Sequence, residues 1–126
     1  MRDSDQSRRL PDANISEALD QMWVRYRPQI LERVAVLEAA ASALTAKSLT
    51  AFECEAAHAA AHKLAGTLGM FNLERGTNLA RELEASYAPD SPPAPDEATH
   101  LTSLAAELRT MIESRKSGIE NHKSSG

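Results

Sequence analysis

The chain has 126 residues, of which 42% are hydrophobic, so it is long enough for one domain with a core of its own. Its net charge of −4 argues against a nucleic-acid-binding surface, which needs an excess of basic side chains to neutralise phosphates. The single cysteine, Cys54, excludes an internal disulfide, and no apolar run approaches the roughly 20 residues of a membrane span, so we expect a cytoplasmic protein.

The first predicted element is a long amphipathic helix that follows a polar segment. Asn14 and Glu17 have the spacing of a capping box, which predicts that the helix begins there. Pro28 lies inside the pattern and removes one backbone donor, so we expect this helix to be kinked or split. Hydrophobic residues recur at steps of three or four along one predicted buried face: Ile15, Leu19, Met22, Trp23, Tyr26, Ile30, Val34, Leu37, Ala41 and Leu44.

A second capping box, made by Thr50 and Glu53, predicts the start of the next helix. This helix continues to about Phe71. Asn72 tolerates a left-handed backbone and is therefore expected to end it.

Two more helices are predicted over residues 73–87 and 96–115. The proline-rich stretch 88–95 between them reads as a stiff, exposed connector. The charged run 81–84 is expected on a solvated helix face.

The predicted fold class is therefore all-α, an antiparallel four-helix bundle with a kinked or split N-terminal helix. The bundle is expected to span residues 14–115. Residues 1–13 and 116–126 are polar and are expected to form flexible tails.

The most informative stretch is residues 61–71 of the second predicted helix. On a helical wheel of about 100° per residue, Gly66 and Gly69 fall on the same side as His62, one and two turns further on. The leucines and the phenylalanine of the stretch fall on the opposite side. Each interior glycine costs a helix about 1 kcal/mol relative to alanine, so this pattern indicates that something approaches the histidine closely.

The same stretch resembles the signature of histidine phosphotransfer (HPt) domains, in which a leucine follows the histidine by two positions and glycines by four and seven. Leu64, Gly66 and Gly69 match these positions. The likeness continues through residues 74–84, extends loosely back to residues 23–31, and covers most of the predicted bundle.

The resemblance implies that His62 is the phospho-accepting histidine and that the chain is a phosphocarrier, not an enzyme. A histidine is partly neutral at pH 7, and neutral imidazole has a nucleophilic lone pair. The implied partners are receiver domains of response regulators, with a hybrid sensor histidine kinase as a further candidate. The receiver supplies Mg²⁺, so the chain needs no cofactor or metal of its own. No Gly-rich ATP loop is present, and a monomer without nucleic-acid or membrane partners is expected.

The predicted partner-docking surface is the helix side around the histidine. It comprises Glu55, His58, Ala59, Lys63, Ala65, Gly66 and Gly69.

One position departs from the family pattern. The family usually has a lysine three residues after the histidine, where it neutralises the phosphoryl group, and this chain has Ala65. Lys63 points about 100° away from His62 and substitutes only in part.

Two other functions fit the same residues. One is a module that binds receiver domains without phosphate turnover, an alternative that Ala65 keeps open. The other is a metal-binding bundle, because Glu55, His58 and His62 share one helix face at a spacing that zinc sites use.

Overall fold

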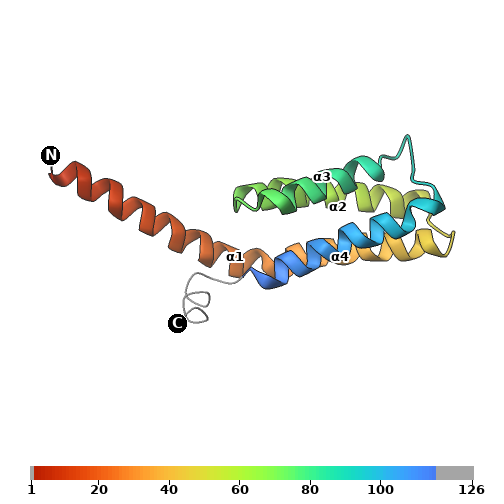
Figure 1. The fold of residues 1–126 in the computed structure, drawn as a ribbon, viewed down its shortest axis with the longest axis horizontal. Helices are drawn as coiled ribbons and strands as arrows, with labels where there is room; N and C mark the ends of the chain where they lie inside the picture. The colour runs from red at the N-terminus through yellow and green to blue at the C-terminus, as the bar shows by residue number, and fades with distance from the viewer. Residues whose placement is uncertain (1, 116–126) are drawn as a thin grey trace.

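The computed structural model describes residues 2–115, with side chains described from Ile15 onward, and confirms an all-α fold (Figure 1). α2 packs chiefly against α3 and α1 against α4, which gives two helix pairs that face each other. Residues 116–126, predicted as a tail, lie outside the described part of the chain. The described elements are α1 (Arg2–Thr45), α2 (Ala51–Met70), α3 (Glu74–Ser86), the 3₁₀ turn η1 (Pro95–Glu97) and α4 (Ala98–Ser114).

α1 is longer than predicted. It begins at Arg2, so the predicted helix start at Asn14 is wrong. Once a helix is nucleated, each added residue costs little, and polar residues such as those before Asn14 are compatible with a helix. Ile15, predicted in the core, is 56% exposed, because α1 extends here beyond the other helices (Figure 1).

The proline inside α1 does not split it. The helix is continuous through Pro28. Its axis changes direction between the red and the light-orange parts of the ribbon in Figure 1, the region of the chain that contains this proline. The helix is therefore bent in one piece, as expected where proline removes a backbone donor without ending the helix.

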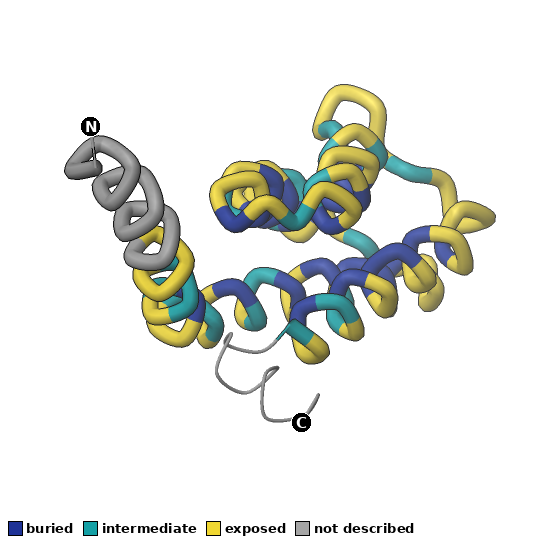
Figure 2. Tube along the Cα trace, turned by 60° about the vertical axis from the view of Figure 1, so that its left-hand side comes forward, coloured by how far each residue is buried: buried dark blue, intermediate teal, exposed yellow. Residues whose placement is uncertain are grey.

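The core lies between the two helix pairs. Figure 2 shows buried stretches on all four helices, alternating with exposed ones. Trp23 of α1 is 1% exposed and meets the ring of Phe71 edge-on, with centroids 5.1 Å apart. The predicted apolar side of α2 is confirmed, because Leu64 and Leu68 are fully buried. The largest other core side chains are Tyr87, Ile30, Leu37, Leu79, Leu83, Leu101, Leu108 and Ile112.

Local signals fix both ends of α2. The Thr50 hydroxyl accepts a hydrogen bond from the Glu53 backbone N–H (3.1 Å), and the Glu53 carboxylate accepts one from the Thr50 N–H (2.9 Å). This confirms the predicted capping box. At the other end Asn72 has φ 60, the left-handed conformation expected of it. The chain then turns back into α3, so that α2 and α3 form an antiparallel hairpin beside the core.

Candidate functional site

His62 lies on the exposed side of α2, with 73% of its side chain accessible. Its Nδ1 is 2.8 Å from Oε2 of Glu84, a residue of α3. Because a carboxylate only accepts hydrogen bonds, Nδ1 carries the proton and donates it. The lone pair is then on Nε2, which makes no hydrogen bond with any other described residue. The hydrogen bond at Nδ1 therefore fixes the orientation of the ring, and Nε2 is left without a partner among the described residues.

Glu84 fixes a second imidazole as well. Its backbone carbonyl accepts a hydrogen bond from Nδ1 of His58, at 2.9 Å. This contact draws His58 toward α3, and its side chain is half-buried as a result. Sequence reasoning missed Glu84, because it lies 22 residues after His62 and no spacing within one helix relates the two.

The two glycines near the histidine are not required by the packing of the fold. A Cβ atom added to Gly66 would meet nothing within 4 Å, and one added to Gly69 would make an ordinary contact with a threonine hydroxyl at 3.7 Å. Gly76 of α3 differs, since its Cβ would lie 3.0 Å from Sδ of Met111 and 3.1 Å from Cδ1 of Leu68. Gly76 serves close helix packing, whereas Gly66 leaves clearance on the outer surface.

The structure leaves two members of the predicted docking surface off the exposed side of α2, the half-buried His58 and the buried Ala65. Ala65 is 7% exposed and belongs to the hydrophobic core, because its side of α2 turns toward the interior. The remaining exposed set is called the α2 face below. It consists of Glu55, Ala59, His62, Lys63, Gly66 and Gly69.

Two large apolar side chains that sequence reasoning overlooked flank the α2 face. Phe52, in the first turn of α2, is 78% exposed, and Met70, its last residue, is 43% exposed. A helical wheel places both about 80° from His62 on the side opposite Ala65, but the wheel alone does not show which of the two sides is exposed.

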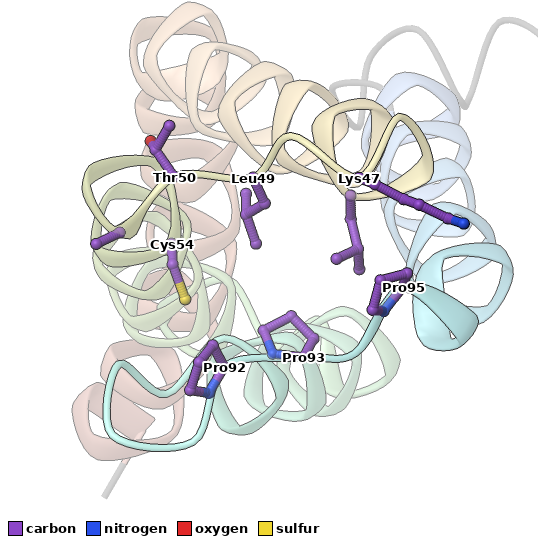
Figure 3. A pocket seen from close by; sticks show the side chains of 9 residues that line it. Lys47, Leu49, Thr50, Cys54, Pro92, Pro93 and Pro95 are labelled. Carbon is purple, nitrogen blue, oxygen red and sulfur yellow. The ribbon is translucent and has the colours of Figure 1, made fainter.

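A pocket of about 370 Å³ lies at the end of the bundle where α2 begins (Figure 3). It opens between the loop before α2 and the proline-rich connector, and its lining is mostly apolar. The Cys54 thiol in its wall donates to the Tyr87 carbonyl at 3.3 Å. Burial, then the nearby Glu55 charge, raises the pKa of Cys54, so the thiol stays protonated and unreactive at neutral pH. This pocket contributes no reactive group to the site at His62.

The metal-binding arrangement considered from the sequence is not formed. Within the described part of the chain, no three potential ligand side chains gather in one place. Glu55, His58 and His62 share a helix face, but both histidines turn their Nδ1 atoms to Glu84.

Comparison with known proteins identifies the family to which the chain belongs. The family described as Hpt domain matches residues 21–118. The chain belongs to the Hpt domain family. Its members carry phosphoryl groups in two-component signalling and are not kinases, and the matched residues include His62.

One curated relative is Protein RcaC of Microchaete diplosiphon, which is 39% identical over 66 residues. The aligned part makes up 52% of this HPt chain but only 10% of that protein. No solved structure gives a significant match. Among the described helices, none combines the length and the apolar character that a membrane span requires.

Proposed function

We propose that this HPt domain relays phosphoryl groups between His62 and aspartates of response-regulator receiver domains. The observation that carries the proposal is the state of the ring: His62 is exposed, Nδ1 is held by Glu84, and Nε2 has no partner among the described residues. Family membership supplies the phosphotransfer setting.

The chemistry requires little of this chain. The Nε2 lone pair forms an N–P bond while the P–O bond to the receiver's aspartate breaks, and the aspartate leaves as a carboxylate. Because Nδ1 keeps its proton, the phosphorylated ring bears one positive charge. Glu84 accepts the Nδ1–H bond and stabilises that charge, so its carboxylate is a positioning and electrostatic group. Reversal of the same steps passes the phosphoryl group to a second receiver.

The receiver supplies the phospho-aspartate and the Mg²⁺ in this scheme, and the HPt chain needs no cofactor of its own. The α2 face is the proposed docking surface, with Phe52 and Met70 as apolar contacts at its two ends. A surface of this small size fits a weak, transient complex. A monomeric cytoplasmic protein suits repeated encounters with different receivers.

The decisive experiment measures phosphate transfer from receiver domains, phosphorylated with acetyl phosphate and Mg²⁺, to the wild type and to His62→Gln. We expect acid-labile, base-stable label on the wild type and none on the variant. His100→Gln is the matched control, because His100 is also an exposed histidine on a glutamate, with Nε2 2.8 Å from Glu82. It should be labelled like the wild type.

A wild type that binds receivers but never takes up label refutes the relay. That result favours the alternative of a receiver-binding module without phosphate turnover. Label that persists in His62→Gln contradicts the assignment of the histidine.

A further inference from the structure

Phosphorylation of His62 creates an unbalanced cluster of negative charge. A phosphoryl group carries about −1.5 to −2 charges at neutral pH and the Glu84 carboxylate adds one more, whereas the protonated ring between them supplies only one positive charge. The residue three positions after His62 is Ala65, which is buried and uncharged. A cation from elsewhere in the chain must therefore reach the phosphoryl group if this chain is to neutralise it.

The pairing of α2 and α3 shows which residue replaces position 65 on the surface. His62 contacts Glu84, and seven residues further along α2 Gly69 faces Thr77, seven residues back along α3. The two helices therefore run antiparallel in constant register. Three residues on from His62 is Ala65, and three residues back from Glu84 is Arg81. Arg81 thus lies across from the buried Ala65, about one helical turn before Glu84.

The side chain of Arg81 also has the direction and the freedom from other contacts that this role requires. On a helical wheel it lies about 60° from Glu84, on the side away from the buried Ala80 and Leu83. It is exposed and makes no hydrogen bond or ion pair with any other described residue.

The other cation of α3 is committed elsewhere. Arg75 pairs with Glu107 of α4 at 2.8 Å, on the far side of the helix.

Lys63 is the nearest cation on α2 itself, but it projects in the wrong direction. His58, which contacts α3, lies about 40° to one side of His62 on the helical wheel, and Lys63 lies about 100° to the other side. Lys63 therefore points away from α3 and from the edge at which the ring is held. Its position suits contact with a docked partner better than contact with the phosphoryl group.

We propose that Arg81 supplies the positive charge that stabilises the phosphoryl group on His62, a charge that this chain carries on α3 in place of α2. The inference rests on the proposed phosphotransfer function. The guanidinium donates hydrogen bonds to the phosphoryl oxygens once the N–P bond has formed, and no proton is transferred.

The test is the equilibrium distribution of label between a receiver domain, phosphorylated with acetyl phosphate, and the HPt chain. Variants Arg81→Gln, Arg81→Lys and the matched control Arg75→Gln each change one arginine of α3. We expect Arg81→Gln to lower the fraction of label on the HPt chain about two- to fivefold, the range for a partly exposed charge pair. Arg81→Lys retains most of the label, and Arg75→Gln matches the wild type. The deficit shrinks as salt is raised, because salt screens exposed charges.

Two further measurements separate this role from docking and from the function itself. Binding of the unphosphorylated receiver should be the same for Arg81→Gln and the wild type. If label is equal in Arg81→Gln and Arg75→Gln, or if receiver binding falls with the label, the proposed role of Arg81 is overturned while phosphotransfer stands. A wild type without label overturns the phosphotransfer function and this role together.

Discussion

Replacing Gly66 with alanine should stabilise this HPt domain, although glycine stands in its signature. Alanine is favoured over glycine inside a helix by about 0.5–1 kcal/mol, because glycine loses more backbone freedom on folding. Nothing lies within 4 Å of the added Cβ, so no packing penalty offsets the gain. For a chain of this size that gain corresponds to a rise of about 3 °C in the melting temperature.

Thermal and urea unfolding followed by circular dichroism measure the effect. Gly76→Leu is the opposing control, since even a Cβ at that position approaches Met111 and Leu68 at 3.0 and 3.1 Å. It should destabilise the fold by about 1–3 kcal/mol through overpacking. If Gly66→Ala lowers the melting temperature, the argument that this glycine is free of intramolecular constraint is refuted.

The functional counterpart uses a larger side chain at the same position. Gly66→Leu should fold at least as stably as the wild type, yet weaken receiver binding about tenfold or more, because its side chain fills the clearance beside His62. Ala106→Leu, on an exposed position of α4, controls for an added surface leucine. Equal receiver binding by the two leucine variants would mean that the clearance at Gly66 is not used in docking.

Four further outcomes are expected. Burial of the Tyr87 hydroxyl, followed by the charge of Cys54, raises the pKa of Tyr87 from 10.0 to about 12. The folded state therefore holds the hydroxyl proton more tightly than the unfolded state. The resulting stabilisation is complete below pH 10 and is lost between pH 10 and 12; urea titrations over this range should show a larger loss in the wild type than in Tyr87→Phe. Tyr87→Phe should also gain about 1 kcal/mol at pH 8, because the buried hydroxyl has no partner among the described residues. Thr50→Ala should cost about 1 kcal/mol of unfolding free energy by removing the N-cap of α2, and an unchanged urea midpoint would contradict this. Glu84→Ala should slow labelling of His62 about tenfold in the transfer assay while leaving receiver binding intact, and equal rates would show that the ring needs no positioning.

Local patterns predicted the parts of the fold that local interactions determine. The capping box at Thr50 and the left-handed Asn72 each depend on a few neighbouring residues, and both are confirmed. The predicted start of α1 at Asn14 is too late, because the capping signal there competes with a helix that can continue through polar residues.

The same distinction between local and long-range interactions applies to the residues of the candidate site. The wheel of α2 alone placed His62 beside Gly66 and Gly69 on an exposed side, as the structure has them. The wheel does not show where the neighbouring helix lies, so Ala65, about 60° from His62, was assigned to the surface although it is buried. The sequence alone does not predict the role of Glu84, because its contact with His62 depends on the register between α2 and α3.

The two hydrogen bonds that Glu84 accepts affect how long a partner must stay bound to react. Its carboxylate and its carbonyl hold His62 and His58 before any partner arrives. The imidazole therefore has little rotational freedom left to lose, and a receiver need not wait for the side chain to find its reactive orientation. In the proposed relay, a complex that lasts only briefly is then sufficient for transfer, so the carrier does not need to bind a receiver tightly.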